Sequence, residues 1–106
     1  MLPFEIKKGA NNLPVDVTPF SDTVYHLLLT PSTNKVVTVP AGARVALINY
    51  DANTWVRINA VAVVPASDVV DGTGSDLNPS AKYLDGVTTI NFISPSPAKI
   101  SIAWFK

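Results

Sequence analysis

The side chain best suited to acid–base chemistry is His26, the only histidine in the chain. A Ser-His-Asp site requires an imidazole beside a nucleophilic hydroxyl and an orienting carboxylate, and no motif around His26 supplies that arrangement. A zinc site needs several ligands, but the chain has no cysteine and no second histidine. His26 lies in the apolar run 24–29, where alternation groups it with Val24 and Leu28. We therefore predict a strand position for His26 and no enzyme activity.

Carboxylates are the second kind of candidate, and four lie in or near the longest loop, namely Asp68, Asp71, Asp76 and Asp85. Calcium binds several oxygen ligands on flexible loops, but this spacing does not match the alternating positions of an EF-hand. Asp and Gly are also common in turns for local reasons. The single glutamate leaves the chain without the paired-carboxylate motif of glycoside cleavage. We therefore expect turns in this region, with no metal and no cofactor.

A third candidate is an aromatic–cationic pair. Trp55, Arg57 and Asn59 alternate with Val56 and Ile58, so the first three residues are expected on one face of a strand. An exposed Trp beside an Arg is typical of an interface anchor, and the same pair is suited to holding a sugar ring. The other interpretation is that Trp55 covers the edge of the core. The sequence leaves both interpretations open.

Short runs rich in Val, Ile, Thr and aromatic residues must position these side chains, and nine prolines and five glycines separate the runs. No segment has a helical stripe over three turns. We predict strands over residues 23–30, 35–39, 44–50, 54–64, 87–93 and 99–105. In the last strand, Ile100, Ile102 and Trp104 alternate onto one face. Tight turns are expected at 40–42 and 85–86, where Gly42 and Gly86 permit a positive φ. Residues 80–84 fit one helical turn or a short edge strand. The pattern predicts an all-β fold, an antiparallel β-sandwich or jelly roll of six to eight short strands.

The first quarter of the chain is irregular, and residues 9–19 contain two prolines and two adjacent asparagines. This composition predicts a loop or an extended arm. We assign residues 1–22 to an extended N-terminal arm and residues 23–106 to a single β-sandwich domain. The arm either wraps its own domain or clasps a neighbouring subunit. The apolar contact residues expected in it are Leu2, Phe4, Val15 and Phe20.

Composition narrows the classes of partner. Charged residues make up 15% of the chain, and eight basic residues balance eight acidic ones. A neutral chain has no long-range field to attract phosphate backbones, which disfavours nucleic acid as a partner. The most apolar stretch, residues 56–66, contains Arg57 and Asn59 and is too short to cross a membrane. Residues 1–10 lack the apolar run of a signal peptide, which predicts synthesis in a cytoplasm.

Several turn and strand signatures resemble those of small structural proteins of tailed bacteriophages. They are residues 37–42 (VTVPAG), 55–57 (WVR), 65–69 (PASDV), 71–79 (DGTGSDLNP) and 99–105 (KISIAWF). The resemblance extends over about two-thirds of the chain. Within that group the chain is similar to head cement or decoration proteins with a jelly-roll or β-sandwich fold. These signatures contain no catalytic residues.

The resemblance implies a cement protein that sits on the assembled head as a homotrimer or homodimer. Its implied partner is the major capsid protein, whose subunit contacts it would stabilise on the capsid surface of the virion. Small tail and adhesion domains use similar strands and loops, so the alternative is a tail or head-surface module that binds host glycans. The contact residues expected on the domain are Trp55, Arg57, Asp71 and Leu77.

Overall fold

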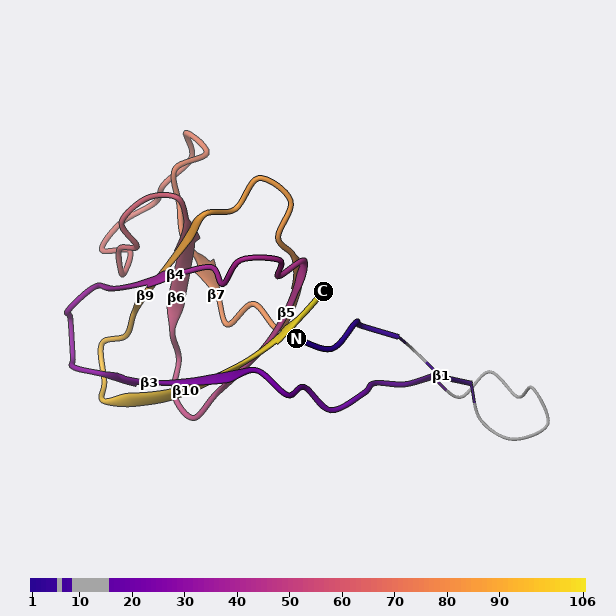
Figure 1. Ribbon diagram of the computed structural model, residues 1–106. Helices are drawn as coiled ribbons and strands as arrows, with labels where there is room; N and C mark the ends of the chain where they lie inside the picture. The colour runs from indigo at the N-terminus through magenta and orange to yellow at the C-terminus, as the bar shows by residue number, and fades with distance from the viewer. Residues whose placement is uncertain (6, 9–15) are drawn as a thin grey trace.

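The computed structural model describes residues 1–5, 7–8 and 16–106, which form strands joined by turns and loops (Figure 1). The strands in these ranges are β1 (Lys7–Lys8), β2 (Asp16–Val17), β3 (Val24–Leu29), β4 (Lys35–Thr38), β5 (Val45–Tyr50), β6 (Trp55–Ile58), β7 (Asp76–Leu77), β8 (Ala81–Tyr83), β9 (Thr89–Ile93) and β10 (Ala98–Phe105). Eight of them, β3 to β10, build the body of the molecule. The prediction of an all-β chain is therefore confirmed.

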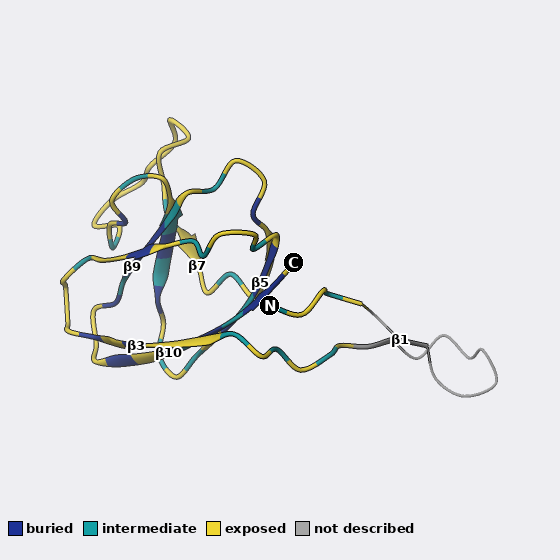
Figure 2. Cartoon of the chain, in the orientation of Figure 1, coloured by how far each residue is buried: buried dark blue, intermediate teal, exposed yellow. Residues whose placement is uncertain are grey.

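Two four-stranded antiparallel sheets pack face to face. The first, which we call the β3 sheet, has the order β3-β10-β5-β8, and the second, the β4 sheet, has the order β4-β9-β6-β7. Buried apolar residues of both sheets form one core cluster. Buried residues lie along the strands, while most of the loops are exposed (Figure 2). The predicted β-sandwich is confirmed.

The pairing of the strands is nested along the chain. The first strand of the body, β3, pairs with the last, β10, and the next pairs inward are β4 with β9, β5 with β8 and β6 with β7. Two further pairings, β10 with β5 and β9 with β6, complete the sheets. Neither sheet can therefore form before segments far apart in the sequence have met.

The core is centred on β10. Its alternating residues Ile100, Ile102 and Trp104 are fully or almost fully buried, as the sequence pattern predicted. The indole of Trp104 meets the ring of Tyr25 edge to face, with 5.4 Å between ring centroids. Its Nε1 is buried and has no hydrogen-bond partner within the described part of the chain. Trp104 therefore contributes through packing, and its N–H carries a desolvation cost.

One predicted strand is too long. The strand expected over residues 54–64 ends at Ile58, because Asn59 adopts a left-handed backbone conformation with a φ of 56°. Asn is among the few residue types that tolerate this region. Residues 80–84, predicted as either one helical turn or a short edge strand, contain the edge strand β8 at 81–83. The two-residue strands β2 and β7 were not predicted.

The side chain of Asn59 clamps the end of β6 onto the turn before β9. Its Oδ1 accepts hydrogen bonds from Thr88 N, Thr88 Oγ1 and Thr89 N at 2.9, 3.0 and 3.2 Å. Its Nδ2 donates to the carbonyl oxygen of Gly86 at 3.0 Å. Gly86 itself has a φ of 73°, as expected for the predicted Asp85–Gly86 turn. Beyond Asn59 the chain leaves the β4 sheet, and residues 60–75 form a long loop.

The N-terminal residues lie on their own domain. Phe4 N donates to Lys106 O and Lys106 N donates to Leu2 O, so the two ends of the chain run side by side. The ring of Phe4 covers the outer side of Phe105, with 5.2 Å between ring centroids. The amino group of Met1 lies 3.6 Å from Asp22 Oδ1. The two alternatives for the segment 9–19 stay predictions, because residues 9–15 lie outside the described residues.

The next part of the arm points away from the body. Strands β1 and β2 pair antiparallel, with Lys7 opposite Val17 and Lys8 opposite Asp16. The pair projects from the sandwich, at the right of Figure 1. The molecule is therefore elongated, with principal extents of 50 × 27 × 26 Å. At the base of the arm, Ser21 Oγ donates to Trp104 O at 2.7 Å and anchors the chain as it enters β3.

Candidate functional site

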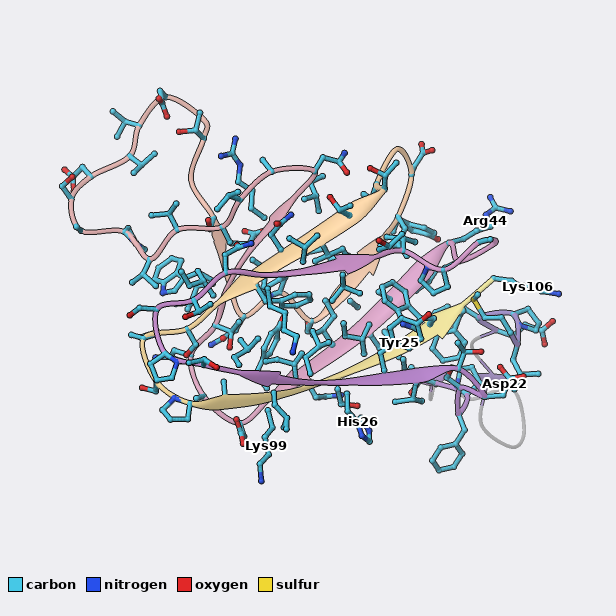
Figure 3. All side chains as sticks on the ribbon, turned by 60° about the vertical axis from the view of Figure 1, so that its left-hand side comes forward. Asp22, Tyr25, His26, Arg44, Lys99 and Lys106 are labelled. Atoms are coloured by element: carbon cyan, nitrogen blue, oxygen red, sulfur yellow. The ribbon has the colours of Figure 1, made fainter. Side chains whose placement is uncertain are left out.

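His26 lies on the exposed outer face of the β3 sheet, in the predicted alternation with Val24 and Leu28. His26 and Lys99 point away from the sandwich, whereas Tyr25 points between the sheets (Figure 3). Ser101 is directly opposite His26 on β10. Within the described residues, no hydrogen bond reaches the His26 ring. The strand position predicted for His26 is confirmed.

Trp55 lies on the outer face of the β4 sheet. It is opposite Leu77 on β7 and Ile93 on β9, and residues directly opposite one another project from the same face. Arg57 follows on the same side of β6, and the intervening Val56 is buried between the sheets. The predicted alternation is confirmed for residues 55–57, whereas Asn59, predicted on the same face, lies beyond the end of β6 in a left-handed conformation. Trp55 is half-buried, so its ring both covers the sheet and keeps an accessible edge.

The long loop folds back over this outer face through a polar network. Asn34 Nδ2 donates to Asn91 Oδ1 at 3.1 Å, and Asn34 Oδ1 accepts from Ala62 N at 2.9 Å. Asn91, which is buried, donates through Nδ2 to Arg57 O at 3.5 Å. Ala62 is in turn almost completely buried under the loop. The two asparagines therefore hold the start of the loop against the sheet.

Between the loop and β6 lies a groove of about 420 Å³, lined by Trp55, Arg57, Val63, Pro65, Val69, Thr73, Gly74 and Ser75. A hydrogen bond from Val63 N to Ser75 Oγ, 3.1 Å long, closes the loop on itself beside the groove. One wall is aromatic, another is aliphatic, and the polar side chains of the lining are the Arg57 guanidinium and the Thr73 and Ser75 hydroxyls. We call this hollow the Trp55 groove.

Asp71 adds a negative charge next to the Trp55 groove. Thr73 donates to Asp71 Oδ1 through its hydroxyl at 2.6 Å and through its backbone N–H at 3.1 Å. These two hydrogen bonds, the side-chain one first, lower the pKa of Asp71, and the positive charge of Arg57 adds to the effect. The groove thus has an aromatic ring and a guanidinium in its lining, with a carboxylate held beside it by Thr73, which suits a ligand rich in hydroxyl groups.

The predicted contact residues fall into two groups. Trp55, Arg57, Asp71 and Leu77 come together at the β4 sheet and its loop. The arm residues Leu2, Phe4 and Phe20 lie in the N-terminal segment: Phe4 packs on Phe105, whereas Leu2 and Phe20 are exposed. Val15 lies outside the described residues. The sequence reasoning missed Asn34 and Asn91, although an Asn between the apolar Ile90 and Phe92 is a signal for a buried polar network.

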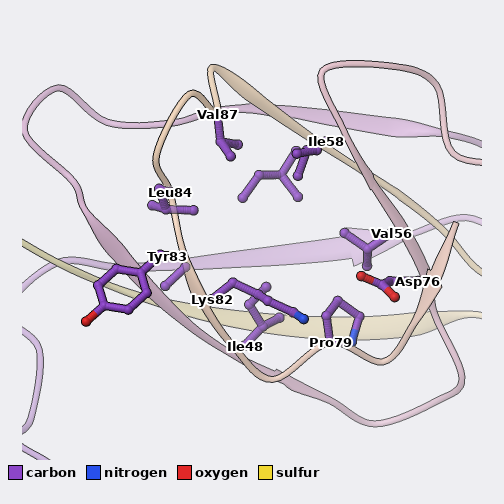
Figure 4. Close-up of a pocket in the computed structure, with 11 residues that line it drawn as sticks. Ile48, Val56, Ile58, Asp76, Pro79, Lys82, Tyr83, Leu84 and Val87 are labelled. Carbon is purple, nitrogen blue, oxygen red and sulfur yellow. The ribbon is translucent and has the colours of Figure 1, made fainter.

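A second hollow opens between the sheets at the β7–β8 side (Figure 4). It has a volume of about 160 Å³ and a floor of core residues that includes Ile48 and Ile90, and Asp76 and Lys82 also line it. The hydroxyl of Tyr50 donates to Pro79 O nearby. Burial raises the pKa of Tyr50, and the negative charge of Asp76 adds to the effect, so this phenol stays protonated and keeps donating.

The described residues contain neither a cluster of metal ligands nor a helix that could cross a membrane. No group of three or more His, Asp or Glu side chains in these ranges is arranged to hold a metal ion. The aspartates at 68, 71, 76 and 85 therefore do not converge on one metal site there. No segment in the same ranges forms a helix with the length and apolar character needed to cross a membrane.

Comparison with known proteins returned no match. No protein-family model matches the sequence, and neither a curated protein nor a solved structure is significantly similar to the chain. The features that describe the chain are those of its own structure: the β-sandwich fold, the projecting arm and the Trp55 groove.

Proposed function

We propose that the protein is a phage capsid cement or decoration protein, which binds the assembled head and stabilises contacts between major capsid subunits. The sequence resemblance is one support. Another is the nested pairing of eight strands in two sheets, which is compatible with the jelly roll that the resemblance implies. In this proposal the protein is made in the host cytoplasm, associates with itself and acts on the capsid surface of the virion.

The observation that carries the proposal is a pair of exposed apolar segments at opposite sides of the molecule. Phe20, at the base of the arm, is 96% exposed, and Val70, in the long loop, is 94% exposed. The arm and the loop project from different sides of the sandwich (Figure 1). A protein that bridges two neighbouring subunits needs two separate contact surfaces, and these segments provide them.

The energetics suit attachment in many copies. Burying an exposed Phe or Val side chain contributes about 1.5–3 kcal/mol. Each contact is therefore modest, but engaging both segments of one molecule makes the second contact intramolecular and strengthens attachment. The near-neutral charge of the chain also limits long-range repulsion from a charged shell.

The proposal is tested by binding the purified protein to expanded, undecorated phage heads. Wild-type protein is expected to bind saturably and to raise the temperature at which the heads break. Phe20→Asp and Val70→Asp should each weaken binding by about tenfold to a hundredfold, because each places a carboxylate in an apolar contact.

Tyr83→Asp is the matched control for these variants. Tyr83 is also largely exposed, at 83%, but it lies on β8 and belongs to neither the arm nor the long loop. This variant should bind heads as the wild type does. Wild-type protein that neither binds saturably nor stabilises heads would overturn the proposal, and so would equal losses in all three variants.

The Trp55 groove favours a second candidate function, a tail or head-surface module that binds host glycans. Sugar rings stack on aromatic side chains, and sugar hydroxyls form hydrogen bonds with charged side chains. Trp55 and Arg57 line the groove, and Asp71 lies next to it. On a glycan array, this function predicts selective binding that Trp55→Ala reduces by at least tenfold.

Val36→Ala is the control for that experiment, because Val36 is an exposed apolar residue on β4 that does not line the groove. It should leave glycan binding unchanged. An array without signal, or equal losses in Trp55→Ala and Val36→Ala, contradicts the glycan function and leaves the head-binding proposal untouched.

A further inference from the structure

Strand β3 has a free edge with a defined set of backbone groups. Trp104 N donates to Thr23 O at 2.9 Å, which places the backbone groups of Thr23 on the side of β10. Because hydrogen-bonding direction alternates along an antiparallel strand, the N–H and C=O groups of Val24, His26 and Leu28 point away from β10. Lys35 Nζ reaches Leu28 O from outside, at 3.3 Å, which agrees with this direction.

This edge is the longest one that the described sandwich presents. Strand β3 has six residues, whereas the other edge strands, β4, β8 and β7, have four, three and two. Val24 and Leu28 are 46% and 67% exposed, so apolar side chains accompany the free backbone groups. Proteins usually protect such an edge with charged side chains or bulges, and none of the three outward positions carries a carboxylate, an ammonium or a guanidinium.

We propose that β3 pairs antiparallel with β3 of a second copy of this chain, about a twofold axis at His26. In this register each Val24 is opposite Leu28 of the second copy, and the two His26 residues face one another. All three outward positions then meet outward positions, so each facing pair exchanges two N–H···O bonds. The two β3 sheets become one continuous sheet, and the closed twofold contact uses the same strand in both copies.

The side chains select this register over its neighbours. Shifting the pairing by two residues in one direction places Leu28 opposite Asp22, and shifting it in the other places Val24 opposite Thr30. Only the register centred on His26 pairs apolar with apolar at both flanking positions. It also extends an existing row, because Val24, Ala103 and Leu47 are neighbours across β3, β10 and β5, and Leu28 of the second copy continues that row.

The contact replaces the hydrogen bond that Lys35 makes to Leu28 O. That hydrogen bond is long and exposed, so replacing the Lys35 ammonium with a backbone N–H of the second copy costs little free energy. The contact does not use Phe20, Val70 or the Trp55 groove. Self-association through β3 is therefore independent of head binding.

The first test is a charge swap measured by analytical ultracentrifugation of the full chain over a range of concentrations. Wild-type protein is expected to sediment as a dimer that dissociates on dilution. Val24→Lys and Leu28→Glu should each weaken the dimer at least tenfold, because each places a charge opposite an apolar side chain. The double variant should recover the wild-type affinity to within a fewfold, because each introduced ammonium then faces an introduced carboxylate of the other copy.

The recovery identifies the register, because positions 24 and 28 lie about 13 Å apart along one strand and cannot pair within a copy. A second test removes a backbone donor. His26→Pro deletes an N–H that points away from β10, so the monomer should keep its circular dichroism spectrum and the dimer should be lost. Ala81→Pro is the control on β8, where Ile48 N donates to Ser80 O and the N–H of Ala81 points outward. It should keep the dimer.

Three results would overturn the proposal: a wild-type chain that stays monomeric at millimolar concentration, a dimer that survives both His26→Pro and Leu28→Glu, or a charge swap without recovery. These results are separable from the failure of the proposed function. A monomer that binds heads contradicts only the β3 contact, and a dimer that ignores heads contradicts only the cement function.

Discussion

Replacing Trp104 with alanine is expected to lower the free energy of unfolding by about 3–5 kcal/mol. Trp104 is completely buried in the centre of the core, where its ring also packs edge to face against Tyr25. Removing the indole leaves a large cavity that two hydrogen-bonded sheets cannot close by small shifts. Urea denaturation followed by circular dichroism, at one fixed protein concentration, measures the change.

The matched control is Trp55→Ala, which deletes the same side chain from a half-buried position on the outer face. Its expected cost is less than half that of Trp104→Ala, because Trp55 is only partly buried and lies outside the space between the sheets. Trp104→Phe should cost less than the lost volume suggests, since it also removes the buried Nε1–H that has no partner within the described chain. Equal losses at the two tryptophans would contradict the core assignment.

Replacing Asn59 with alanine is expected to lower the free energy of unfolding by about 2–3 kcal/mol, from two causes that add. Alanine is strained in the left-handed conformation of this residue, at about 1 kcal/mol or more. The substitution also removes the contacts with Gly86, Thr88 and Thr89, and each typical hydrogen bond contributes about 0.5–1.5 kcal/mol. The same urea titration measures this loss.

Two further substitutions at Asn59 separate the causes. Asn59→Gly accepts the positive φ but makes no side-chain bonds, so it should cost less than Asn59→Ala. Asn59→Asp keeps the accepting oxygen and loses only the donation to Gly86, so it should cost least. Asn49, which is exposed on β5, provides the control, and Asn49→Ala should change stability by about 0.5 kcal/mol or less. Identical losses for the Gly and Ala variants would show that backbone strain plays no part.

The Asn59 clamp also explains where reasoning from sequence fails. Residues 54–64 continue in apolar and β-branched types, and a period-two pattern alone predicts one long strand. The strand ends at Ile58 because the Asn59 side chain finds partners about thirty residues further along the chain. A local pattern contains no information about such partners, so this boundary required the tertiary structure.

The Trp55 groove, too, could be predicted from the sequence only in part. That Trp55 and Arg57 share a face follows from alternation, which is a local property of any strand. That the loop closes over them depends on Asn34 and Asn91, which are 57 residues apart and meet only because β4 pairs with β9. The place of Asp71 beside Arg57 follows from that closure and was not predictable from its position in a run of turn residues.

By itself, the sequence determined the all-β class, the turns at Gly42 and Gly86 and the buried alternation of Ile100, Ile102 and Trp104. These features depend on backbone preferences and on a period of two, and both act over a few neighbouring residues. Only the tertiary structure decided the order of the strands, the covering of Phe105 by Phe4 and the free edge of β3. Each of these depends on contacts between segments distant in the chain, whose energies arise only when the whole sandwich assembles.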